Sequence, residues 1–304
     1  RGAGGSGTSE PPATFPRPPP GAVTASWERR LRRAEELAQR WPFATEALQF
    51  YVHVARFQAS LQDALRGSVP VLASREEGFV LRSASPLDHR LLLRPKFAGF
   101  LELVREVAPP QLATAADALR STPEELWEAL WDGYWRGQAL PDLEVEGPVL
   151  AFFPKAFLQP YAALLAAGLR GDGEGDALSG PGVETSPVCP LCGAAPQVSV
   201  LREEGHGAAR SLLCSRCETE WRYKRVRCVA CGEEEAGRLV YLQAAEWPHV
   251  RVSACQVCRR YIKEVDLTRD GLAVPVVDEI AAIPLDLAAG EEGYEKVEPN
   301  LIGL

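Results

Sequence analysis

Cysteine placement is the feature that most constrains how this chain can fold. All eight cysteines lie between residues 189 and 258, and each belongs to a Cys-x-x-Cys pair. Cysteines buried for packing scatter along a chain, and a thioredoxin-type redox motif usually occurs once, whereas four pairs supply thiolates for two tetrahedral metal sites. We therefore interpret the pairs as metal ligands, with disulfides and inert core thiols as the alternatives. The candidate ligands are Cys189, Cys192, Cys214, Cys217, Cys228, Cys231, Cys255 and Cys258.

The cysteine region is an internal duplication. A shift of 39 residues places CPLCG on CVACG, and a shift of 41 places CSRC on CQVC. In each copy a glycine-closed pair is followed by β-prone sequence and then by a second pair, which is typical of zinc-ribbon and rubredoxin-like modules. Because each copy can close locally, we expect the first four cysteines to share one metal and the last four to share another. Interleaved pairing is the alternative.

The predicted sites are closed ones. Four protein ligands leave no open coordination position, so neither metal could activate a water molecule. We expect structural sites, or at most electron-accepting ones. Tetrathiolate sites accept zinc and iron alike, so the cofactors are predicted to be two tetrathiolate ions of zinc or iron. Since the cysteines fill both sites, His206 and His249 are interpreted as loop residues.

The region before the cysteines reads as helical. Apolar residues recur at helical spacing from Trp27 to Trp41, and ordered structure is expected to begin near Ser26. The arginines of ERRLRRAEE lie largely off this apolar stripe, which indicates a solvated helix face. These arginines are Arg29, Arg30, Arg32 and Arg33.

Further helices are expected at 44–67, at 97–107 and around STPEELWEALWDGYWRG, where Thr122 would be the N-cap and Glu125 the capping-box acid. The tryptophan-rich stripe of the last of these helices is more simply core packing than a ligand groove. The apolar stretch 148–169 carries Lys155, Gln159 and two prolines, so it is predicted to be a core helix or a pair of short ones, and not a membrane span.

These patterns predict an α+β fold class, with an N-terminal all-α domain followed by two tandem rubredoxin-like or zinc-ribbon β modules. The Gly- and Pro-rich N-terminus and a Gly-rich stretch after the helices have the composition of a tail and a linker. The predicted parts are a disordered tail (1–23), a helical domain (24–170), a linker (171–187), a first metal-ribbon module (188–226), a second one (227–268) and a C-terminal acidic segment (269–304).

Charge and composition narrow the classes of partner. The net charge of -8 argues against a general binder of nucleic acid or of anionic membranes. The N-terminus lacks the apolar segment of a secretory signal, so we expect a cytoplasmic protein without membrane insertion, whose thiols stay reduced. One basic and aromatic stretch joins the two modules and is a candidate partner-binding surface. It comprises Trp221, Arg222, Lys224 and Arg225.

Two stretches resemble a known family. CSRCETEWRYKRVRCVACG and VDEIAAIPLDLAAGEEGYEKVEPNLIG look like the formate dehydrogenase accessory proteins of the FdhE family, and LAQRWPFATEALQFYVHVARFQASL is similar to that family's opening helices. The resemblance implies a cytoplasmic, non-catalytic maturation factor with two rubredoxin-like sites that contacts the catalytic subunit of formate dehydrogenase. Glu218 and Arg259 stand where rubredoxin has glycine, which argues against rubredoxin-like redox tuning.

Two other functions stay open at this point: a nucleic-acid-binding zinc ribbon and a rubredoxin-like electron-transfer protein. Between residues 189 and 264 there are 12 Lys and Arg against 9 Asp and Glu, so we do not expect a nucleic acid as the partner. No recognisable catalytic motif occurs, and we predict that the chain is not an enzyme. The stretch 277–304 either wraps back onto the helical domain or contacts the client. A homodimer is also left open.

Overall fold

The computed structural model describes residues 20–69, 79–170, 177–180, 182–205 and 207–303, and its N-terminal half is helical. Residues 1–19 of the predicted tail, part of the predicted linker and His206 lie outside the described residues. The helices of this half are α1 (Pro20–Arg40), α2 (Thr45–Leu65), α3 (Arg90–Val107), α4 (Pro110–Arg120), α5 (Glu124–Arg136) and α6 (Gly147–Arg170).

Helix α6 is the centre of the helical region. Pro154 and Pro160 lie inside it, yet it forms a single helix. Among the described residues it is the one helix that is long and apolar enough to cross a membrane, and 83% of its most apolar window is buried inside the protein. Phe157 of α6 packs edge-on against Phe97 of α3 at 4.9 Å and stacks on Trp131 of α5 at 5.6 Å between ring centroids. Burial of these rings holds the three helices together.

The C-terminal half contains one seven-stranded sheet that is built by translation of a repeat. The order β3-β2-β1-β6-β5-β4 places two antiparallel three-stranded meanders side by side, and β1 and β6 join them in parallel at Ser199 and Glu264. The two modules predicted from the duplication are therefore halves of a single sheet. The strands are β1 (Pro196–Glu204), β2 (Gly207–Cys214), β3 (Glu220–Arg222), β4 (Leu239–Gln243), β5 (Val250–Cys255), β6 (Arg260–Asp266) and β7 (Glu295–Lys296), which pairs with β6.

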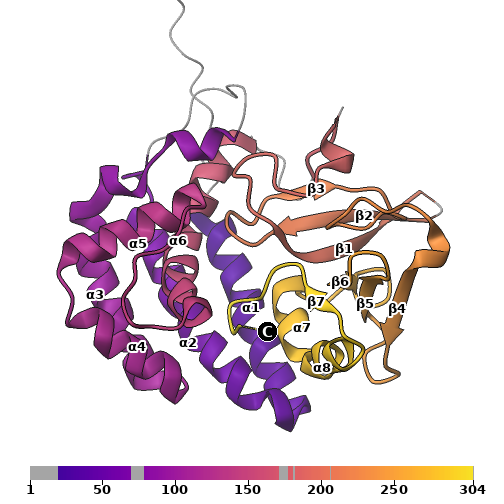
Figure 1. Cartoon of the computed structure of the whole chain (residues 1–304), viewed down its shortest axis with the longest axis horizontal. Helices are drawn as coiled ribbons and strands as arrows, with labels where there is room; N and C mark the ends of the chain where they lie inside the picture. Colours follow the sequence, from indigo (N-terminus) through magenta and orange to yellow (C-terminus); the bar gives the residue numbers. More distant parts are fainter. Residues whose placement is uncertain (1–19, 70–78, 171–176, 181, 206, 304) are drawn as a thin grey trace, which may run out of the picture.

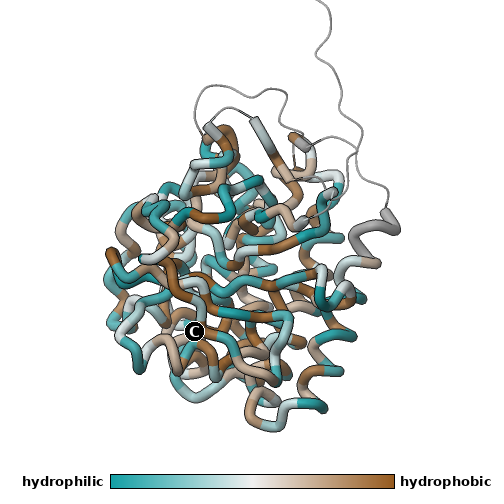
Figure 2. Tube along the Cα trace, turned by 90° about the vertical axis from the view of Figure 1, so that its right-hand side faces the viewer, coloured by the Kyte–Doolittle hydropathy of each residue, from teal (hydrophilic) through white to brown (hydrophobic). Residues whose placement is uncertain are grey.

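The C-terminal segment lies between the helices and the sheet. Its helix α7 (Pro275–Ala281) contacts α1 and α2 on one side and β1 and β6 on the other, while α8 (Ile283–Glu291) covers β4 and β5. The segment is acidic as predicted, but Glu279 and Asp286 are buried and both bind the ammonium group of Lys263, at 3.1 and 2.5 Å. Along the chain as a whole, hydrophobic and hydrophilic stretches alternate (Figure 2). The segment wraps back onto the rest of the protein.

Polar side chains of α6 also tie the two halves together. The ammonium group of Lys155 donates to the carbonyl of Pro299 at 2.5 Å and pairs with the carboxylate of Glu298. The amide of Gln159 donates to the carbonyl of Ser215 at 3.0 Å. These two polar residues were the reason for not predicting a membrane helix here, and in the structure both bind the C-terminal half.

The arginine run of α1 differs from its prediction. Arg29 and Arg32 are exposed, whereas the side chains of Arg30 and Arg33 are only 13% and 11% exposed. Arg30 forms a two-point ion pair with Glu218, and Arg33 binds Asp278. Helix α1 therefore has a second buried face, because a sheet region that the local periodicity does not reveal packs against it.

Several helix ends also differ from the predictions. Helix α1 begins at Pro20 rather than near Ser26, α3 begins at Arg90, and α4 was not predicted. Helix α5 has no side-chain cap, because the hydroxyl of Thr122 donates to the carbonyl of Leu119 at the end of α4. Only three residues separate α4 from α5, so the last turn of α4 offers this acceptor and the capping box does not form.

Candidate metal centres

The cysteines form two groups of four, and each group comes from one repeat. Within each group the sulfur atoms lie within 4.8 Å of one another. The closest sulfurs of the first group are 3.4 Å apart, Cys192 to Cys214, and those of the second are 3.6 Å apart, Cys228 to Cys258. Ligands about 2.3 Å from a tetrahedral zinc ion are about 3.8 Å from each other, so four-sulfur sites of this size fit a metal. The grouping is the tandem one. We call these sets the first cluster and the second cluster.

Tight turns place the first two sulfurs of each cluster. The N–H of Gly193 donates to the carbonyl of Cys189 at 2.9 Å, and the N–H of Gly232 donates to that of Cys228 at 3.1 Å. Both glycines have positive φ, 71° and 80°, which strains a residue with a side chain. At Gly193 a Cβ atom would also lie 2.8 Å from the ring of Phe79.

The other two cysteines of each cluster lie at the end of a strand and in the turn that follows it. Glu218 and Arg259, which replace the glycine of rubredoxin, adopt φ values of 56° and 57°. The backbone thus keeps the left-handed conformation that glycine favours. Tertiary contacts hold it there, since Glu218 binds Arg30 and the guanidinium group of Arg259 lies 3.9 Å from the ring centroid of Tyr294.

The first cluster is a buried site whose charge needs compensation. Its four cysteines are at most 1% exposed. Burial raises the pKa of the Cys214 thiol well above its ordinary value, because a thiolate is poorly solvated there. Four thiolates can share this site only with a cation among them. Backbone N–H groups of Arg216 and Cys217 lie 3.4 Å from the Cys214 sulfur and favour its charged form.

The first cluster also lies at the contact between the two halves of the protein. Arg216, between the two cysteines of its second pair, is buried and donates to the carbonyls of Tyr134 and Trp135 at the end of α5. The N–H of Leu81 donates to the carbonyl of Leu191 in the first pair at 3.0 Å. Sequence reasoning missed these contacts. The one local signal was a charged residue, Arg216, between the two cysteines of a predicted metal-binding pair.

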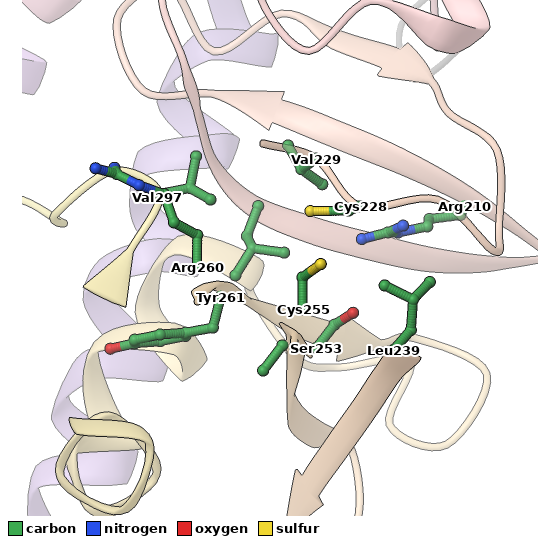
Figure 3. A pocket seen from close by; sticks show the side chains of 11 residues that line it. Arg210, Cys228, Val229, Leu239, Ser253, Cys255, Arg260, Tyr261 and Val297 are labelled. Atoms are coloured by element: carbon green, nitrogen blue, oxygen red, sulfur yellow. The ribbon is translucent and has the colours of Figure 1, made fainter. Parts of the chain in front are cut away.

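The second cluster is open to solvent on one side. Cys231 is exposed and Cys258 is half-buried, whereas Cys228 and Cys255 are buried. The two buried cysteines line a small cavity together with Arg210 and Leu239 (Figure 3). The two clusters thus have the same ligand set in different surroundings, and they should differ in how readily a bound metal leaves.

We expect a chelator to remove metal from the second cluster first. An incoming ligand can reach the metal through exposed Cys231, while the first cluster opens only when the two halves of the protein separate. Metal transfer to a chromophoric chelator should show two phases of equal size. The fast phase should disappear in Cys231→Ser, whose control is Ser253→Ala, near the same cavity. Release of both metals in one phase would contradict the expectation.

The predicted partner-binding stretch divides into one buried residue and three at or near the surface. Trp221 is 0% exposed, and its indole N–H donates to the carbonyl of Ser186, so it cannot stack on a partner. Arg222 pairs with Glu204 and Lys224 with Glu234, while Arg225 donates to the carbonyl of Ala208. Trp221 was assigned wrongly because an aromatic residue in a short strand looks the same whether it faces solvent or the core.

His249 lies in a loop as predicted, but it is buried in a polar group with Asp270 and Asp278. Its Nε2 atom is 2.8 Å from a carboxylate oxygen of Asp278. These three residues are close enough to hold a metal, yet the guanidinium group of Arg33 binds both carboxylates, at 2.8 and 2.5 Å. Arg33 supplies the positive charge of this group.

Comparisons with known proteins agree with this architecture. Residues 188–225 match the family model "FdhE, central domain", and residues 226–302 match "FdhE, C-terminal domain". A protein FdhE homolog from Pseudomonas aeruginosa is 31% identical over 295 residues, which cover 90% of this chain and 88% of that protein. The chain belongs to the FdhE family. A second FdhE homolog, from Aquifex aeolicus, is 30% identical over 280 residues and covers 90% of this chain and 94% of that protein.

An FdhE structure shares the fold as well. The crystal structure of the FdhE protein from Pseudomonas aeruginosa aligns with a TM-score of 0.64 and 27% identity, covering 95% of this chain and 98% of that one. The resemblance and the fold class predicted from the sequence are confirmed: a helical N-terminal region precedes a sheet region with two four-cysteine clusters. The boundary between the matched FdhE domains falls between the two repeats.

Proposed function

We propose that this chain is a cytoplasmic, non-catalytic maturation factor that binds the catalytic subunit of formate dehydrogenase during its assembly. Membership of the FdhE family along nine-tenths of the chain is the observation that carries the proposal. The closed form of both clusters supports it, because four cysteine ligands leave no position for a substrate or a water molecule.

We also propose that each cluster holds one zinc or iron ion and that the eight cysteines are its ligands. The sulfur spacing and the number of ligands fit a tetrahedral ion of either kind. When bound, the metal would cross-link two turns of each repeat. The first cluster would then fix the sheet against α5 and α6, and the assembled surface of both halves would serve as the docking scaffold.

The exposed basic residues at the junction of the repeats are proposed as part of that docking surface. Lys224 and Arg225 are exposed, and Val226 beside them is 44% exposed. Their ion pairs and hydrogen bonds are at the surface, so a partner could replace them at low cost. Arg222 lies next to them and completes the charged part of the stretch.

A pull-down with the formate dehydrogenase catalytic subunit tests the proposal. The metal-loaded chain should retain the subunit, and Lys224→Glu with Arg225→Glu should reduce the retained amount about tenfold, because interface charge reversal costs more than a kcal/mol. Arg29→Glu with Arg32→Glu, on an exposed face of α1, is the matched control and should leave retention unchanged. Metal-loaded, folded protein that retains no subunit would contradict the proposal.

The exposure of the second cluster favours a second candidate function, electron transfer, since a metal ion near the protein surface can exchange electrons with a partner. Protein loaded with iron should then support maturation and show a reversible absorbance change on reduction. Zinc-loaded protein with full maturation activity would remove this candidate. The nucleic-acid interpretation gains no support, because Trp221 is buried and two of the three basic residues pair with carboxylates.

A further inference from the structure

Arg210 is a buried arginine of the first repeat that reaches the second cluster. It lies on β2, and its side chain is 2% exposed. Its Nε atom donates to the hydroxyl of Ser199 at 2.8 Å, and Nη1 donates to the carbonyl of Arg227, next to Cys228, at 2.9 Å. Among the residues that the structure describes, Nη2 has no hydrogen-bond acceptor although it is fully buried.

The guanidinium group lines the same cavity as two of the cysteines of the second cluster. Arg210, Cys228 and Cys255 line the same small cavity, and in Figure 3 the end of the Arg210 side chain points toward the side of the cavity where the two cysteines lie. A buried donor without an acceptor costs about 1–3 kcal/mol, so the place of Nη2 at this cavity requires a reason. The acceptor side chains that line this cavity include the sulfurs of Cys228 and Cys255 and the hydroxyl of Ser253, and of these only the thiolates would carry a negative charge.

The charges around Arg210 also favour an interaction with the second cluster. Glu264 is the carboxylate nearest to Arg210, at 3.2 Å, but it also binds Arg251. One negative charge thus serves two arginines, and Arg210 is the one whose side chain is buried. Four thiolates around a divalent metal carry an excess of negative charge, which a neighbouring guanidinium group would offset.

We propose that Arg210 is a positioning residue of the second metal site, donating an Nη2–H hydrogen bond to the sulfur of Cys228 or Cys255 and offsetting the charge of the tetrathiolate. The proposal rests on metal binding by the second cluster. It makes this site depend on the neighbouring repeat. The strand order explains this dependence. Because β1 of the first repeat pairs with β6 of the second, β2 and its Arg210 belong to the same sheet as the second repeat.

Cadmium-113 NMR tests the hydrogen bond in the unaltered protein. With both clusters loaded with cadmium, a side-chain proton of Arg210 should show scalar coupling to one of the two cadmium resonances, the one assigned to the second cluster. A cadmium-loaded protein in which no arginine proton couples to that resonance would overturn the proposal. Folded protein whose second cluster takes up no metal would overturn the metal assignment as well.

Variants test the effect on the metal. Arg210→Gln should speed metal release from the second cluster about tenfold or more, as second-sphere changes do elsewhere, and Arg210→Lys should have a smaller effect because it keeps the charge. Release from the first cluster should not change. The matched control is Arg260→Gln, since Arg260 lines the same cavity but its side chain is 46% exposed and pairs with Glu295. Wild-type release from folded Arg210→Gln, or an equal effect of Arg260→Gln, would overturn the proposal.

Discussion

Cys214→Ser is expected to unfold most of the sheet region. Cys214 is the last residue of β2, and it and the other cysteines of the first cluster belong to the same hydrophobic core as α5 and α6. Structural zinc contributes about 10–16 kcal/mol to folding in zinc-finger peptides, which matches or exceeds the about 5–15 kcal/mol of stability of a typical domain. Loss of one ligand would leave three buried thiolates and would weaken metal binding at the first cluster.

Circular dichroism, metal analysis and limited proteolysis together measure this outcome. In Cys214→Ser we expect loss of at least one metal per chain and cleavage within 189–266, while α3 to α6 keep much of their helical signal because Phe97, Trp131 and Phe157 pack together without the cysteines. Cys231→Ser is the matched control, since it removes an exposed ligand of the second cluster. Wild-type melting and full metal content in Cys214→Ser would show that the first cluster is not a structural metal site.

The sequence was enough to predict the two clusters because their geometry is local. A Cys-x-x-Cys pair closed by glycine already determines the turn, and a shift of 39 to 41 residues reveals which pairs correspond. The helical region could be predicted for the same reason, since Trp127, Leu130 and Trp131 follow the helix period and are buried. Local patterns thus account for the elements and for the grouping of the ligands.

Contacts between distant segments could not be predicted. The parallel pairing of β1 with β6 joins the repeats 65 residues apart, Ser199 beside Glu264, and neither strand has a distinctive pattern at that edge. Arg30 and Arg210 look like ordinary surface residues, because burial of an arginine depends on a partner elsewhere in the fold. Such residues connect distant segments of the protein, and the sequence around each of them contains no signal that identifies its partner.

Arg33 shows how strongly these distant contacts act. It joins α1 to the C-terminal segment through Asp278, whose side chain is 1% exposed, with N···O distances of 2.5 to 3.2 Å. Arg33→Met should destabilise the protein by about 3–5 kcal/mol, because it leaves a buried carboxylate without its main counter-charge. Adding Asp278→Asn should restore part of the loss, since removal of both charges is far less costly than removal of one.

Urea unfolding followed by tryptophan fluorescence measures this difference. The ring centroids of Trp41, just after α1, and Trp247, between β4 and β5, are 4.6 Å apart, so separation of the two halves should change the fluorescence. Arg32→Met is the matched control: Arg32 is next to Arg33 in the arginine run, and it is exposed, so its loss should change the free energy of unfolding by less than about 0.5 kcal/mol. If Arg33→Met and Arg32→Met were equally stable, the buried face of α1 would not contribute to holding the halves together. A large loss at Arg33 alone would mean that the arginine face of α1, which was predicted to be solvated, holds the C-terminal segment against the helical half.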